Sequence, residues 1–297
     1  MNSRLFALLA AFIATFIYGI NYTIAKDVMP SYVKPYGFII IRILGALPFF
    51  VIASLFHKWE KVARTDYKFI VLAAVFGASL NMLSFFKGLD YTTPINASVI
   101  MVMVPIIVFG LSVLFLKERL IKHRVAGVII GLIGAIVLIT YGKSTGQNAP
   151  DILLGNLLIF CNATLYAFYL IVVKKLLAKY HPLSFVVQIY FVGFIVVLPF
   201  GANEFLAIEW GTIPESILYK ILFVVIGTTF LTYILNLFAL IKLKPTTVSS
   251  FVYLQPVIAT VYALVLKSDE LSTVKIVAAG FIFLGVFLVS KPVKKSA

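Results

Sequence analysis

Ten apolar stretches of about 20 residues each follow one another along the chain, separated by short polar connections. A helix of this length crosses the hydrocarbon core of a bilayer. Because lipid leaves no backbone polar group solvated, each stretch is predicted to be a transmembrane α-helix. The predicted spans are 5–25, 36–56, 68–87, 95–116, 123–141, 152–173, 183–201, 217–240, 246–266 and 273–290.

The composition supports this assignment. The chain is 62% hydrophobic and 12% charged, with a mean hydropathy of +1.08. These values predict an all-α polytopic membrane protein, since a β-barrel would need short segments of alternating hydrophobicity. The net charge of +14 does not indicate a nucleic-acid partner, because cations accumulate on the cytoplasmic side of membrane proteins. The expected surroundings are therefore a lipid bilayer, with no nucleic acid.

The ten stretches form two sets of five that repeat one pattern. An offset of 151 residues superimposes the punctuation of the fourth and fifth stretches on that of the ninth and tenth. The matched pairs are Pro94 and Pro245, Ser98 and Ser249, Pro105 and Pro256, Glu118 and Asp269, Leu120 and Leu271, and Gly134 and Gly285. We predict a first five-helix repeat over 1–141, a linker over 142–151 and a second five-helix repeat over 152–297.

Five is an odd number, so the second repeat must enter the membrane from the opposite side. Inverted repeats of this kind occur in transporters that work by alternating access. Lys and Arg are distributed 17 to 7 between alternate connections, and the richer side includes both ends of the chain. The positive-inside rule therefore predicts that both termini are cytoplasmic.

Several local motifs occur in a fixed order along the chain. They are Tyr18-Gly19-Ile20-Asn21 followed by Lys26, then Arg42, Pro105, the elbow Glu118–Leu120, Pro256 and a degraded second elbow Asp269-Glu270-Leu271. In this order the chain resembles the ten-helix EamA-type branch of the drug/metabolite transporter (DMT) superfamily. That branch carries Trp-Gly-x-Asn in its first helix, and Tyr18 replaces the Trp here. The resemblance implies a multi-pass plasma-membrane carrier that exports amino acids or related metabolites.

Arg42 is the only charged side chain well inside a predicted span, roughly 6 residues or ~9 Å from its end. Charges at this depth usually face a cavity or a partner. One hypothesis is that Arg42 clamps a substrate carboxylate. The alternative is that its long side chain snorkels to the headgroups or caps backbone carbonyls.

Polar and aromatic side chains recur on one face of several spans. Asn162, Tyr166 and Tyr169, for example, are spaced as i, i+4 and i+7. Since an amide facing lipid is costly, these faces are predicted to point inward, either to contact substrate or to form interhelical hydrogen bonds. The candidate substrate-binding residues are Tyr18, Asn21, Arg42, Asn81, Asn162, Tyr166, Tyr169, Asn236 and Tyr253.

Pro105 and Pro256 interrupt equivalent spans. A proline inside a helix leaves one carbonyl without its donor, here those of Met101 and Val252. The two prolines are candidate hinges, and a simple packing kink is the alternative.

No acid or histidine falls at mid-membrane depth in the predicted spans. We therefore expect no catalytic residues, no metal site and no cofactor. A channel is disfavoured because no filter-like loop or ring of charges is present. The predicted function is a secondary transporter for a small metabolite, foremost an amino acid or carboxylate. The alternative is an exporter of lipophilic or multiple drugs.

Small residues on the fifth span bear on assembly. Gly127 and Gly131 form a small-xxx-small edge, with Gly134 behind them. Such an edge permits close helix packing, either inside a monomer or across a homodimer.

Overall fold

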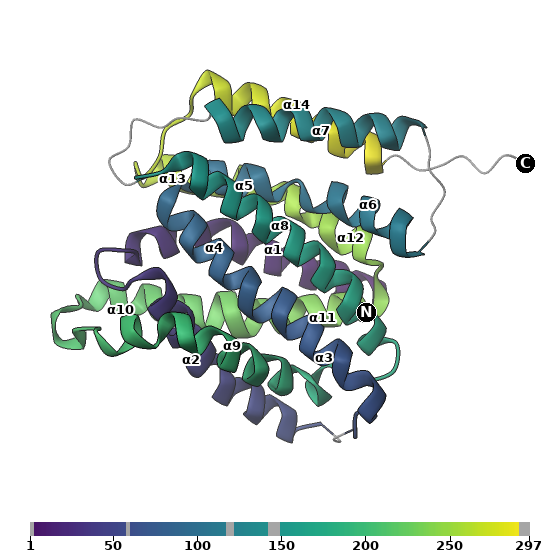
Figure 1. The fold of residues 1–297 in the computed structure, drawn as a ribbon, viewed down its shortest axis with the longest axis vertical. Helices are drawn as coiled ribbons and strands as arrows, with labels where there is room; N and C mark the ends of the chain where they lie inside the picture. Colours follow the sequence, from purple (N-terminus) through teal and green to yellow (C-terminus); the bar gives the residue numbers. More distant parts are fainter. Residues whose placement is uncertain (1–2, 58–59, 117–121, 142–148, 291–297) are drawn as a thin grey trace, which may run out of the picture.

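The structure is a computed structural model that describes residues 3–57, 60–116, 122–141 and 149–290 (Figure 1). Every regular element in these ranges is helical. The elbow Glu118–Leu120 and most of the predicted linker, 142–148, lie outside the described residues.

The elements follow the predicted spans closely. The first half contains α1 (Ser3–Val28), α2 (Pro35–Leu55), η1 (Arg64–Asp66), α3 (Tyr67–Ala74), η2 (Val75–Ser79), α4 (Leu80–Tyr91), α5 (Pro94–Met101), α6 (Val104–Leu116) and α7 (Lys122–Tyr141). The second half contains α8 (Ile152–Leu177), η3 (Pro182–Ser184), α9 (Val186–Leu206), η4 (Trp210–Thr212), α10 (Glu215–Leu222), η5 (Phe223–Leu231), α11 (Thr232–Lys242), α12 (Pro245–Ser250), η6 (Phe251–Leu254), α13 (Gln255–Val265) and α14 (Thr273–Ser290).

Eight helical segments of the described chain are long and apolar enough to cross a membrane. The helices α7 and α14, of 20 and 18 residues, occupy the remaining two predicted spans. The predicted fold class, an all-α polytopic membrane protein, is confirmed.

The two halves pack reciprocally. The helix α4 packs on α8, and α11 packs on α1, so the third span of each half lies against the first span of the other. Equivalent helices also pair directly, α2 with α9 and α7 with α14 (Figure 1). Two copies of one unit produce this reciprocity, and it places the first three spans of each half around a common centre.

The third span of each half contains a π-helical turn, η2 in the first and η5 in the second. The Ser79 hydroxyl donates to the carbonyl of Ala74 (2.8 Å), and the Thr229 hydroxyl donates to that of Val224 (2.7 Å). Each hydroxyl thus donates a hydrogen bond to the carbonyl five residues earlier. The wider π-turn takes that carbonyl out of the α-helical hydrogen-bond pattern. Such π-turns frequently mark functional sites.

A lysine closes the end of the third span in each half. Lys26 donates to the carbonyls of Leu89 (2.8 Å) and Asp90 (2.6 Å) at the end of α4. Lys174 donates to the carbonyls of Leu240 and Leu243 at the end of α11. A cation at a helix C-terminus satisfies free carbonyls and opposes the helix dipole. The offset of 148 residues between the two lysines therefore relates equivalent positions.

The two candidate hinge prolines sit where helices restart. The fourth span breaks after Met101, and Pro105 is the second residue of α6. In the ninth span η6 precedes α13, of which Pro256 is the second residue. Proline is well suited to a first turn because the missing N–H has no helical acceptor there. A role as hinges remains a prediction.

The glycine edge packs inside the monomer. A Cβ added at Gly285 of α14 would lie 2.5 Å from the carbonyl oxygen of Gly127 and 2.6 Å from the nitrogen of Gly131 on α7. One at Gly134 would lie 2.8 Å from Cβ of Phe281. Only glycine allows the two backbones to approach this closely.

Candidate functional site

A cavity of about 90 Å³ lies between the two halves. Eight of the nine candidate residues line it: Tyr18, Asn21, Arg42, Asn81, Asn162, Tyr166, Tyr169 and Asn236. The ninth, Tyr253, is partly buried on η6 and is not among the lining residues. The other lining residues are Tyr22, Gly77, Met82, Phe85, Phe86, Met101, Tyr190, Thr228, Tyr233 and Gln255.

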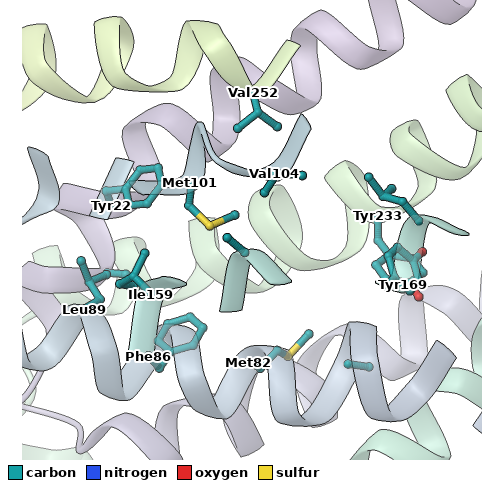
Figure 2. Close-up of a cluster of buried hydrophobic side chains, with 14 of the residues drawn as sticks. Tyr22, Met82, Phe86, Leu89, Met101, Val104, Ile159, Tyr169, Tyr233 and Val252 are labelled. Carbon is teal, nitrogen blue, oxygen red and sulfur yellow. The ribbon is translucent and has the colours of Figure 1, made fainter. Parts of the chain in front are cut away.

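One wall of the cavity is apolar. Figure 2 shows Met82 and Phe86 on α4 and Met101 on α5 within a continuous buried cluster. The same view places Tyr169 and Tyr233 together, away from the methionines, and their ring centroids are 5.7 Å apart.

Arg42 provides the only charge among the lining residues, on α2, where 6% of the residue is exposed. Its Nε donates to Oγ1 of Thr229 (2.9 Å), and its Cζ lies 4.5 Å from the centroid of the Phe86 ring. No carboxylate of the described residues forms an ion pair with it. Arg42 thus faces the centre of the bundle instead of snorkelling to its end.

The lining amides also connect the halves. Asn21 accepts from the Thr228 hydroxyl (3.0 Å). Asn81 donates to the carbonyl of Asn162 (3.2 Å), and Asn162 donates to that of Asn81 (2.9 Å). These residues line the cavity and form interhelical hydrogen bonds, and their contact with a substrate stays a prediction.

Sequence reasoning missed several lining residues. Tyr190 and Tyr233 pack with their ring centroids 4.9 Å apart. The Tyr22 hydroxyl donates to Oε1 of Gln255 (2.7 Å) across the halves. A usable signal existed for Tyr233, because it precedes the candidate Asn236 by three residues and so shares its helix face. No comparable pattern pointed to Tyr190.

Ion pairs tie the halves together at both ends of the bundle. Asp27 at the end of α1 binds Lys220 on α10 (2.7 Å). Asp66 of η1 binds Lys179, which follows α8 (3.0 Å). The two pairs join equivalent helices, the first span of one half and the third span of the other, with the charges exchanged.

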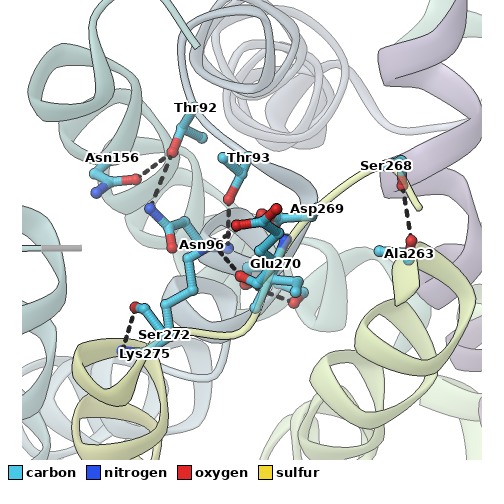
Figure 3. Close-up of polar contacts among 12 residues, drawn as sticks. Thr92, Thr93, Asn96, Asn156, Ala263, Ser268, Asp269, Glu270, Ser272 and Lys275 are labelled. Carbon is cyan, nitrogen blue, oxygen red and sulfur yellow. Dashed lines mark hydrogen bonds and ion pairs between the residues drawn. The ribbon is translucent and has the colours of Figure 1, made fainter. Parts of the chain in front are cut away.

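A further acid connects the halves near the loop between the ninth and tenth spans (Figure 3). Asp269 binds Nζ of Lys275 through Oδ1 (2.8 Å) and accepts from the backbone nitrogen of Ile95 through Oδ2 (3.0 Å). Both charged side chains are buried, 1% and 0% exposed. An acid at the first turn of α5 also favours the positive end of that helix.

Comparisons with known proteins agree with this architecture. The family model of the EamA-like transporter family matches residues 5–140 and again residues 153–291. The chain belongs to the EamA-like transporter family. It is therefore a membrane transporter and not an enzyme, and the family model matches once in each half.

Three relatives of this EamA-family transporter carry names that specify no substrate. An uncharacterized transporter of Archaeoglobus fulgidus is 25% identical over 78% of this chain and 79% of its own length. The uncharacterized transporter YyaM of Bacillus subtilis is 24% identical over 78% and 76%. A WAT1-related protein of Arabidopsis thaliana is 26% identical over 91% and 75%.

A solved crystal structure superimposes on 97% of this EamA-family chain and 98% of its own, with a TM-score of 0.63 and 18% identity. That likeness concerns the fold alone. Within the described residues, no group of three or more His, Cys, Asp or Glu side chains could hold a metal ion.

Proposed function

We propose that this EamA-family transporter exports a small carboxylate metabolite, foremost an amino acid, across the plasma membrane by alternating access. The observation that carries the proposal is Arg42, a buried cation lining the central cavity without an ion-pair partner among the described residues. An unpaired charge away from water costs several kcal/mol, whereas a carboxylate can accept two parallel bonds from a guanidinium. A carboxylate is therefore the solute group that best complements this cavity.

The remaining walls suit a small organic body. Eight aromatic side chains line the cavity, together with the amides of Asn21, Asn81, Asn162, Asn236 and Gln255. At about 90 Å³ the cavity is smaller than the ~150 Å³ apolar cavity that holds benzene in an engineered protein. In this conformation it suits a solute of a few heavy atoms. Because both halves contribute walls, an exchange of their packing would open it to either side.

Thermal stability of the purified protein tests the substrate class. The panel is the twenty L-amino acids, each beside its primary amide. Selective binding raises the apparent melting temperature, so we expect one or more acids to stabilise the protein and their amides to fail. Arg42→Ala should abolish that shift, whereas Arg42→Lys should retain part of it, as a cation without the guanidinium fork. Amides that stabilise as well as the acids would reject the carboxylate proposal.

Transport direction and mechanism need a vesicle assay. Proteoliposomes loaded with an amino acid that stabilises the protein should show saturable efflux and counterflow. A channel would show neither. Flux that rises linearly with concentration would reject a carrier. Protease access to a C-terminal tag in inside-out vesicles would test the predicted cytoplasmic position of the termini.

The aromatic lining favours a second candidate, export of lipophilic drugs. Tetraphenylphosphonium, a lipophilic cation, separates the two candidates. Under the carboxylate proposal the Arg42 charge should repel it, so it should not stabilise the protein. Stabilisation by this cation, with no response to any amino acid, would favour the second candidate.

A further inference from the structure

We infer that Thr229 is a positioning residue for Arg42, and that the π-helical turn of η5 fixes it so that the guanidinium presents its terminal amino groups to the solute carboxylate. The inference rests on the proposed function, since it concerns how the same cation is aimed. It adds a role for a residue that does not line the cavity itself.

The two contacts of the Thr229 hydroxyl determine in which direction it donates its proton and in which it accepts. A hydroxyl has one proton and two lone pairs. The π-turn brings the carbonyl of Val224 within 2.7 Å, and this acceptor takes the proton. Oγ1 is therefore left as an acceptor facing Nε of Arg42 at 2.9 Å, and Thr229 is only 1% exposed.

The guanidinium is restrained by two neighbours. The Phe86 ring packs 4.5 Å from Cζ, and Thr229 occupies the Nε–H. No other hydrogen bond joins Arg42 to the described residues. Of its five donors, the four on the two terminal nitrogens remain. A carboxylate must then bind end-on across both terminal nitrogens, because the side that includes Nε is taken.

The other half contains the same turn without the cation. Ser79 lies two residues after Gly77, as Thr229 lies two after Gly227, and its hydroxyl makes the same bond to a carbonyl five residues earlier. The position equivalent to Arg42 is Gly193, since each lies six residues before the proline inside its helix.

At Gly193 an added Cβ would lie 3.0 Å from Cβ of Ala78, so α9 packs closely against η2. The π-turn and its hydroxyl are therefore shared structural features. The hydroxyl–arginine contact belongs to one half alone, which gives an internal control for the role of Thr229.

Three variants separate the structural role of the hydroxyl in the π-turn from its role in positioning Arg42. Thr229→Val preserves shape but removes the acceptor, Thr229→Ser keeps it, and Ser79→Ala removes the equivalent hydroxyl where no arginine is present. A hydrogen bond to a charged group contributes about 1.5 kcal/mol or more, so Thr229→Val should weaken amino-acid binding about tenfold. The maximal counterflow rate should change less than the apparent KM. Thr229→Ser and Ser79→Ala should bind the amino acids of the panel as the unmodified protein does.

A spectroscopic measurement tests the contact without any solute. The chain has five arginines, so a protein labelled with ¹⁵N-arginine has five Nε–H signals. Arg42→Lys identifies the signal of Arg42. We expect slow exchange of this proton with water in the unmodified protein, Thr229→Ser and Ser79→Ala, and fast exchange in Thr229→Val.

The outcomes distinguish this inference from the proposed function. If Arg42→Ala abolishes amino-acid binding while Thr229→Val leaves it unchanged, or if the Nε proton stays protected in Thr229→Val, the positioning role is overturned. A comparable loss in Ser79→Ala would overturn it too, because the effect would then be that of any π-turn. If no amino acid of the panel binds the unmodified protein, the proposed substrate class fails, and the exchange measurement alone decides whether Thr229 holds Arg42.

Discussion

The two halves of the chain are alike in their backbone contacts and differ in the side chains that carry charge. Both have a π-turn in the third span, a proline at a helix restart and a lysine capping the third span. By contrast, α2 carries Arg42 where α9 carries Gly193, and the ion pairs at the two ends have their charges exchanged. The difference indicates that duplication conserves the frame on which the helices pack, while the buried cation of the cavity is present in one copy alone.

The largest effect on stability is expected at the buried pair Lys275–Asp269, which tests whether the two halves differ in their charged side chains. Lys275→Ala leaves the Asp269 carboxylate buried without its cation, and removing one partner of such a pair costs about 3–5 kcal/mol. We expect a large fall in the temperature of unfolding in detergent, followed by intrinsic fluorescence.

The matched control for Lys275 is Arg124, its equivalent at an offset of 151 residues. The acid equivalent to Asp269 is Glu118, outside the described residues. If Arg124→Ala lowers the unfolding temperature as much as Lys275→Ala, the halves are alike here too. A change of less than about 1 kcal/mol for Lys275→Ala would contradict the buried pair.

The glycine contact between α7 and α14 comes next in size. Gly285→Ala places a methyl group against the backbone of Gly127 and Gly131, and overpacking of this kind costs about 1–3 kcal/mol. Gly280 on the same helix has nothing within 4 Å of an added Cβ, so Gly280→Ala should leave the unfolding temperature unchanged or slightly raised. Equal effects of the two substitutions would show that helix propensity, and not the contact, is being measured.

The ion pairs at the two ends sharpen the comparison further. Asp66 is nearly buried and accepts from both Lys179 and the Tyr180 hydroxyl (2.8 Å), whereas Asp27 and Lys220 are about one-third exposed. Asp66→Asn should lower the unfolding temperature more than Asp27→Asn, because Asp66 accepts from two donors and an exposed pair such as Asp27 and Lys220 contributes only about 0–1 kcal/mol. The charge-swapped double variant Asp27→Lys with Lys220→Asp should recover the stability that either single change loses. Failure of that rescue would mean that the charges contribute nothing.

The smallest expected effect is a dependence on pH near His181. Burial lowers the pKa of His181, the neighbouring His57 ring stacked at 3.6 Å lowers it further, and Glu60 opposes both. The unfolded state therefore binds its proton first as the pH falls below about 6.5, and the native state loses stability down to the lowered pKa.

This loss should be below about 1 kcal/mol because His181 is partly solvated. Comparing unfolding temperatures at pH 7.5 and 5.5 in the unmodified protein and in His181→Gln measures it. At an offset of 151 residues, the positions in the other half that correspond to His57 and His181 are Ile208 and Pro30, which do not titrate. An identical pH response in His181→Gln would assign the effect to other groups.

The spans and the repeat were predictable from sequence because lipid imposes length and polarity on every helix. Most of the cavity was predictable for the same reason, since polar groups such as Asn21 and Asn236 must face inward. The contact between Arg42 and Thr229 was not, because it joins positions 187 residues apart and depends on a π-turn with no local sequence signal.

Tyr253 shows where helical periodicity fails. This candidate lies on η6, a 3₁₀ segment with fewer residues per turn than an α-helix. The face that Tyr253 presents is therefore rotated relative to the following helix α13. Conversely, Tyr190 lies in a span whose other polar side chains, Ser184 and Gln188, are not at helical spacing from it, so its facing direction could not be assigned.

The backbone contact between α7 and α14 also limits how the molecule can move. Where Gly285 meets Gly127 and Gly131, backbone packs directly on backbone, so the two helices cannot slide or rotate past each other there without a clash of main-chain atoms. We expect these two helices to remain a rigid pair at the edge of the bundle (Figure 1). The rearrangement that moves a solute from one side of the membrane to the other would then take place in the other eight spans, which turn about a support that both halves share.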